Sequence, residues 1–82
     1  DYEGAIEDYS RAIELDPKNF SAWNNRGLAR ENTGDPDGAI ADFTRAIELD
    51  PEYFGTWYNR GNARSRNARK PPPGATAPGA GW

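Results

Sequence analysis

The chain has 82 residues, of which 35% are hydrophobic, so it can form at most one small domain with a limited core. It contains no Cys and no His, which excludes disulfides, thiolate nucleophiles and the commonest general base and metal ligand. The net charge of -3 hides an asymmetry: all thirteen acidic residues lie between Asp1 and Glu52, and from Tyr53 onward every charge is positive.

Apolar residues never run for more than a few positions, so the sequence indicates neither a membrane span nor a secretory leader. The chain contains no Met and begins at Asp1 directly inside a helical pattern, which indicates a piece of a longer protein. We expect a soluble protein. The sequence does not reveal its compartment, for which the cytoplasm is the default.

The first two predicted elements are helices over Tyr2–Leu15 and Phe20–Asn32. In the first, apolar residues recur at spacings of three and four, as on one face of an amphipathic helix. Asp16 and Pro17 end it, because the residue before a proline is pushed out of the helical region and proline has no amide donor. Gly34 closes the second helix.

The third and fourth predicted helices repeat the first two. AIEDYSRAIELDP at Ala5–Pro17 recurs as AIADFTRAIELDP at Ala39–Pro51, an offset of 34 residues (position 39 against position 5). FSAWNNRGLAR at Phe20–Arg30 recurs as FGTWYNRGNAR at Phe54–Arg64 with the same offset. We therefore expect helices over residues 37–49 and 54 to about 67, the third preceded by an Asp-Pro pair that suits a helix start.

Short turns and a distinctive C-terminal segment complete the predicted layout. Turns of about four residues or fewer join the helices, so neighbouring helices must run antiparallel. From about Ala68 the pattern gives way to RKPPPGATAPGAGW, which can neither continue a helix nor bury a core. We expect residues 68–82 to be disordered.

The repeat unit carries aromatic, small and proline residues at fixed places. These are Trp23, Gly27, Ala39, Phe43, Ala46 and Pro51. Their spacing within a 34-residue helix-turn-helix period resembles the tetratricopeptide repeat. The NRG and AIxDYxRAIELDP segments are similar to one subtype of that family. The resemblance implies an all-α fold, a right-handed solenoid of antiparallel helix-turn-helix repeats, over residues 1–67. A half repeat would cover 1–19, a full repeat 20–53 and a second half repeat 54–67.

Several residues have predicted structural roles. Gly27 and Gly61 stand where a neighbouring helix must come close. Arg26 and Arg60 fall on the packed side of their helices, where an unpaired charge is costly, so we expect each to pair with Asp8 or Asp42, which recur at the repeat offset. The aromatic residues at buried spacing are predicted to carry most of the core, namely Tyr9, Phe20, Trp23, Phe43, Phe54 and Trp57.

The resemblance also suggests a binding surface, because in this family the first helix of every unit lines a concave groove that grips partners. The exposed stripe of Phe20–Asn32 and of the fourth helix then supplies short amides around one Leu and one Tyr. The candidate partner-binding residues are Asn24, Asn25, Leu28, Asn32, Tyr58, Asn59 and Asn62. Amides can hydrogen-bond the main chain of an extended peptide, while Leu and Tyr cover apolar side chains. The alternative, a merely solvated helix face, stays open.

One subclass, the chaperone-binding repeats, grips a terminal carboxylate with a clamp of Asn, Lys and Arg. Asn25 fits one of the Asn positions, but Gly55 and Asn59 stand at the basic positions of the last helix. The likeness therefore does not extend to a carboxylate clamp.

The expected function is a protein-protein interaction module that binds an extended peptide or partner segment and acts as an assembly scaffold. The sequence contains no catalytic motif, cofactor site or metal-ligand cluster, and it indicates no small-molecule substrate. Self-association through exposed repeat ends is the main alternative. Weak nucleic-acid contact through the basic segment 60–70 is a lesser one, disfavoured by the acidic bulk of the chain and by the lack of aromatic residues between the basic ones.

Overall fold

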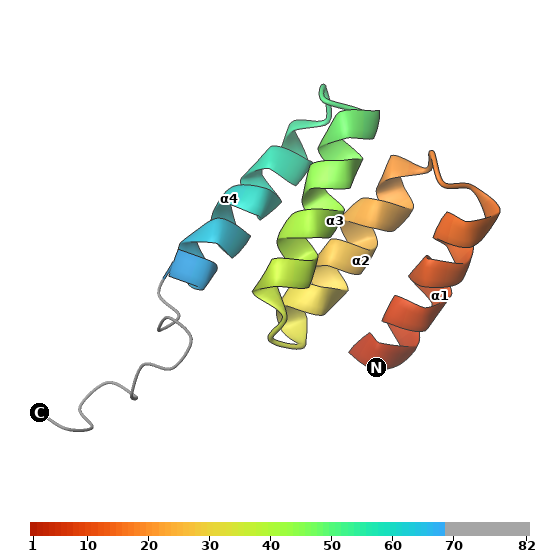
Figure 1. Ribbon diagram of the computed structural model, residues 1–82, viewed down its shortest axis with the longest axis horizontal. Coiled ribbons are helices and arrows are strands. Elements are labelled where there is room, and N and C mark those ends of the chain that lie inside the picture. Colours follow the sequence, from red (N-terminus) through yellow and green to blue (C-terminus); the bar gives the residue numbers. More distant parts are fainter. Residues whose placement is uncertain (69–82) are drawn as a thin grey trace, which may run out of the picture.

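The computed structural model describes residues 1–68, which form four helices arranged side by side in chain order (Figure 1). The helices are α1 (Tyr2–Leu15), α2 (Phe20–Asn32), α3 (Pro36–Leu49) and α4 (Phe54–Ala68). The all-α prediction is confirmed, with the predicted bounds of α1 and α2 unchanged. Helix α3 begins one residue early and α4 ends one residue late. The tail predicted to be disordered covers residues 68–82. Ala68 is instead the last residue of α4, and residues 69–82 lie outside the described residues.

Local side chains set the beginning and end of each helix. Asp1, Asn19 and Asp35 cap α1, α2 and α3, each through a side-chain oxygen that accepts a backbone amide hydrogen of the first turn. The helices α1 and α3 end at Asp16 and Asp50, whose φ angles of -147° and -146° lie outside the helical range. The same Asp-Pro pair therefore produces the same turn twice.

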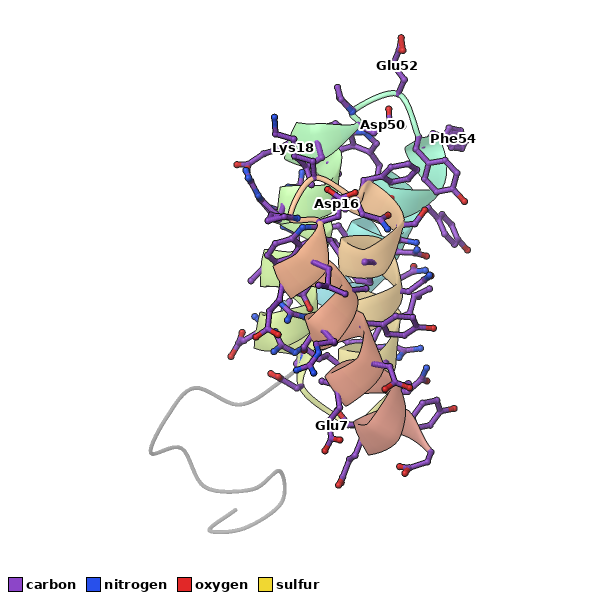
Figure 2. All side chains as sticks on the ribbon, turned by 90° about the vertical axis from the view of Figure 1, so that its right-hand side faces the viewer. Glu7, Asp16, Lys18, Asp50, Glu52 and Phe54 are labelled. Atoms are coloured by element: carbon purple, nitrogen blue, oxygen red, sulfur yellow. The ribbon has the colours of Figure 1, made fainter. Side chains whose placement is uncertain are left out.

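The four helices form two layers. Helices α2 and α4 contact each other directly, while α3 packs against both α2 and α4. Helix α1 packs against α2. Figure 2 shows the turn after α1, marked by Asp16 and Lys18, at the same end of the molecule as the turn after α3, marked by Asp50 and Glu52. Residues 34 apart thus occupy matching places, as the repeat requires.

The core lies where α3 is enclosed by α2 and α4. Ala39, Phe43 and Ala63 are 0% exposed, and Leu28 and Ile40 pack against them. Gly27 provides the space for this arrangement, because a Cβ atom placed on it would lie 2.6 Å from the Phe43 ring. The predicted close approach is confirmed at Gly27. At Gly61 that prediction is wrong for residues 1–68, because none of their atoms lies within 4 Å of a Cβ atom placed there.

The predicted aromatic core is only partly correct. Phe43 is fully buried, and the side chains of Trp23 and Tyr9 are half-buried. Phe54 and Trp57 are instead 71% and 46% exposed. Their helical spacing is that of a buried face, but within residues 1–68 no helix packs on the outer side of α4. No helix in this part of the chain is long and apolar enough to cross a membrane.

Candidate functional site

A buried ion pair fixes the relative positions of α2 and α3. The Arg26 Nε and Nη2 atoms donate to the two Asp42 carboxylate oxygens at 2.9 and 2.8 Å, with the Asp42 side chain 2% exposed. The predicted bidentate pair is thus confirmed for Arg26. Its Nη1 donates to Ser10 Oγ at 3.0 Å, so one guanidinium connects α1, α2 and α3. The group also lies 5.0 Å from the Trp23 ring centroid, a cation-π contact.

Arg30 adds a second positive charge to this pair. Its Nη1 atom lies 3.3 Å from Asp42 Oδ2, and its side chain is 28% exposed. The carboxylate is therefore shared by two arginines of the same helix, one turn apart. Arg30 thus makes a polar contact with α3.

The prediction that Arg60 pairs with Asp8 or Asp42 is wrong. Arg60 donates to Thr44 Oγ1 at 3.2 Å and lies 5.0 Å from the Trp57 ring centroid, which reproduces the Ser10 and Trp23 contacts of Arg26. Within residues 1–68 it has no carboxylate partner. Arg26 uses the acid of the next helix, 16 residues later. The corresponding residue for Arg60 is Thr76, which is not acidic.

A cavity of about 310 Å³ lies between α1 and α2 and contains three of the predicted site residues, Asn25, Leu28 and Asn32. The side chain of Asn25 makes no hydrogen bond within residues 1–68. The Asn32 amide nitrogen donates to the Leu28 carbonyl oxygen at 3.0 Å, which leaves its side-chain oxygen open to a ligand.

Helix α1 supplies the other wall of the cavity, which the sequence analysis missed. The lining residues from this side are Asp1, Tyr2, Ala5 and Tyr9, and α2 adds the buried Ala29. The predicted groove contains only the first helix of each unit, whereas the cavity also has a wall from the second helix of the preceding unit. The apolar residues of α1 that repeat every three to four positions were the signal that could have found this wall.

The remaining predicted site residues lie elsewhere. Asn24 is 7% exposed and its side-chain oxygen accepts a hydrogen bond from Asn59 Nδ2 at 3.2 Å, so the expectation of an exposed Asn24 is wrong. Two neighbouring helices of the same layer meet at this position. Tyr58 is 69% exposed and belongs to a separate cavity of about 650 Å³ with Pro51, Phe54 and Trp57. Asn62 is exposed and lines neither cavity.

Two polar contacts hold α2 and α4 together on the layer that contains most of the predicted stripe. One is the hydrogen bond between Asn59 and Asn24, and the other is an ion pair of Arg66 Nη1 with Glu31 Oε2 at 3.5 Å. The Glu31 side chain is 11% exposed, while that of Arg66 is 64% exposed. In residues 1–68, no group of three or more potential metal-binding side chains is present.

Family models match most of the helical region. A model described as TPR repeat matches residues 1–34, and one described as Tetratricopeptide repeat matches residues 20–53. The chain belongs to the tetratricopeptide repeat family. No curated protein is significantly similar to it.

The assignment to the tetratricopeptide repeat family shows which helices form one repeat. The second match, residues 20–53, contains α2 and α3 and coincides with the predicted full repeat. Tetratricopeptide repeats generally mediate protein-protein interactions and scaffolding, and the family is generally non-catalytic. A protein or peptide is therefore the typical partner of such a fold.

Proposed function

We propose that this chain holds an extended segment of another protein in the cavity between α1 and α2, as part of a scaffold for protein assembly. The observation that carries the proposal is the lining of this cavity. An unpaired amide, Asn25, lies beside the apolar Leu28 and faces two tyrosines of α1. A family whose members generally bind proteins supports the same choice of ligand.

The size of the cavity favours a peptide side chain over a free small molecule. Its volume of about 310 Å³ is at the lower end of the range for ligand sites, which suffices for one large apolar group. Leu28, Ala5 and Tyr9 supply apolar surface for that group. The Asn25 amide offers both a donor and an acceptor to the main chain of the segment.

The charge of α1 favours a partner segment with basic residues beside its apolar anchor. This helix carries the carboxylates Glu3, Glu7, Asp8 and Glu14 against the single Arg11. None of these four carboxylates lines the cavity, but a negatively charged helix beside it attracts a positively charged segment and accelerates its association, an effect that salt screens. We therefore expect a partner segment that combines an apolar anchor with Lys or Arg.

Replacing both Tyr2 and Asn25 with alanine is expected to weaken partner binding at least about tenfold. The change removes an exposed aromatic wall and the unpaired amide, and neither side chain belongs to the buried core. Partners are captured from a lysate, identified by mass spectrometry and reduced to their shortest binding segment. The dissociation constant of that labelled segment is then measured by fluorescence anisotropy for both forms.

The matched control replaces Arg45 and Glu48 with alanine. These residues form an exposed ion pair at 3.1 Å on α3, away from the cavity, so binding should stay within about twofold of the unmodified chain. Equal affinity of all three forms for the segment would rule out the cavity as the site. Capture of nucleic acid alone, released by salt or nuclease, would instead support contact through the basic segment.

A further inference from the structure

The outer face of α4 repeats the face of α2 that binds α3, but within residues 1–68 nothing covers it. Five residues are identical in the two faces. Phe54, Trp57, Arg60, Gly61 and Arg64 stand where α2 has Phe20, Trp23, Arg26, Gly27 and Arg30. Figure 1 places α4 and α1 at opposite ends of the row of helices.

The space over Gly61 on this face is unfilled within residues 1–68, and we call it the socket. A Cβ atom on Gly27 would lie 2.6 Å from the Phe43 ring, because that ring fills the space over the glycine. The equivalent atom on Gly61 would have no atom of the described part of the chain within 4 Å. The outer face of α4 therefore has the shape that receives an aromatic ring in α2, without a ring in residues 1–68 to fill it.

The same face carries two arginines that have no carboxylate partner within residues 1–68. Arg26 and Arg30 share Asp42 in the α2–α3 pair. Arg60 has the same cation-π contact and the same kind of hydroxyl partner as Arg26, while Arg64 is exposed. Neither forms an ion pair within residues 1–68. An acidic residue beside a ring would complete this face.

Helix α1 carries the side chains that this face lacks. Its segment Ala5–Pro17 repeats the α3 segment Ala39–Pro51, with Asp8 and Tyr9 at the places of Asp42 and Phe43. Asp8 is exposed and makes no ion pair within residues 1–68, whereas Asp42 is 1% exposed. Tyr9 is half-buried where Phe43 is fully buried. The side of α1 that corresponds to the α2-binding side of α3 is thus uncovered.

The two uncovered faces also have opposite charge. Helix α4 carries three arginines and no acidic residue. Helix α1 carries four acidic residues and one arginine. Because Arg66 is paired with Glu31 of α2, the charge of the outer α4 face comes from Arg60 and Arg64. Placing the negatively charged α1 against them is more favourable than placing two such α4 faces together.

We infer that α1 of a second copy docks on the outer face of α4 and completes a tetratricopeptide repeat between two chains. Asp8 of the second copy lies between Arg60 and Arg64, and its Tyr9 fills the socket over Gly61, as Asp42 and Phe43 do within the chain. The contact joins two different faces, so each added copy leaves a new free α4. The expected product is an open head-to-tail array whose length grows with concentration.

Two single substitutions test this inference, one on each face. Gly61→Leu fills the socket at a position where no atom of residues 1–68 lies within 4 Å of the new Cβ atom, and Asp8→Arg places a positive charge against the arginines of α4. Each is expected to weaken self-association at least about tenfold and to leave the circular dichroism spectrum helical. Sedimentation equilibrium over a wide range of concentration measures the average mass. For the unmodified chain this mass is expected to rise steadily with concentration and to fall as salt is added.

Mixing the two variants distinguishes this geometry from others. The Gly61→Leu chain keeps a usable α1, and the Asp8→Arg chain keeps a usable α4, so the mixture should form a one-to-one dimer that grows no further. An unmodified chain that stays monomeric would overturn the inference. So would variants that each associate as well as the unmodified chain, which indicates a symmetric α4 contact or a contact outside both faces.

The outcome is separable from that of the proposed partner cavity. Gly61→Leu changes the outer face of α4 and no residue of that cavity. Asn25 is not a suitable separating variant, because it corresponds to Asn59, which contacts Asn24 of the neighbouring helix, and would therefore lie at the stacked contact. The stacked arrangement would bring α4 of one copy beside Ala5 and Tyr9 of the next, two residues of the cavity wall. Partner affinity is therefore measured with the Gly61→Leu chain. A Gly61→Leu chain that stays monomeric and binds the partner segment supports both proposals. An unmodified chain that stays monomeric contradicts the stacking alone, and a Gly61→Leu chain that does not bind the segment contradicts the partner cavity alone.

Discussion

Replacing Asp42 with alanine is expected to lower the free energy of unfolding by about 3 kcal/mol. The change leaves Arg26, whose side chain is 14% exposed, without the carboxylate that accepts two of its hydrogen bonds. Breaking a buried pair costs about 3–5 kcal/mol, and the lower value applies because Arg26 keeps the Ser10 hydroxyl and the Trp23 ring. Small domains have a low free energy of unfolding. The midpoint temperature of thermal unfolding should therefore fall strongly, or the unfolding transition should no longer be seen.

The repeat provides a matched control for this prediction. Asp8→Ala removes the equivalent carboxylate from α1, where it is exposed and unpaired within residues 1–68. Its effect should stay within about 0.5 kcal/mol. Urea unfolding followed by circular dichroism, at a concentration too low for self-association, compares the two variants. Equal losses of stability at both positions would contradict the bracing role of the Arg26–Asp42 pair.

Alanine at Gly27 and alanine at Gly61 are expected to change stability in opposite directions. At Gly27 the new methyl group meets the buried Phe43 ring at 2.6 Å. Overpacking of this kind costs about 1–3 kcal/mol, partly offset by about 1 kcal/mol of gained helix propensity. At Gly61 only the propensity gain applies, so the chain should become about 1 kcal/mol more stable.

Thermal unfolding of both alanine variants checks this difference at low protein concentration. The two glycines have the same sequence neighbourhood, since both occur in NRG, so intrinsic helix propensity alone predicts the same change. A similar gain at both positions would mean that the Phe43 ring moves aside without cost. A loss at both would mean that α4 has a covered outer face.

Local sequence was sufficient to predict the helices. The Asp-Pro pairs and the helical spacing of apolar residues act over a few neighbouring residues, and the 34-residue repeat applies them a second time. The expected bounds therefore differ from the structure by at most one residue, at α3 and α4. The Arg26–Asp42 pair could also be anticipated, because an arginine on a packed face needs an acid and the repeat supplies one on the facing helix.

The site was harder to predict because its exposure depends on helices distant in the chain. Asn24 lies on the predicted stripe but is buried by Asn59 of α4, 35 residues away. Helical spacing marked Phe54 and Trp57 as core residues, although burial also requires a helix on the other side. The cavity at Asn25 has a wall from α1, so reading single helices in isolation gave only half of it.

The measurement that tests the proposed function most directly is an NMR titration of the isotope-labelled Gly61→Leu chain with the shortest captured partner segment. We expect the largest amide shift changes at residues around the cavity, namely Tyr2, Ala5, Tyr9, Asn25, Leu28 and Asn32, with little change along the outer side of α3. Changes centred on α4, or spread evenly over the four helices, would contradict a partner site between α1 and α2.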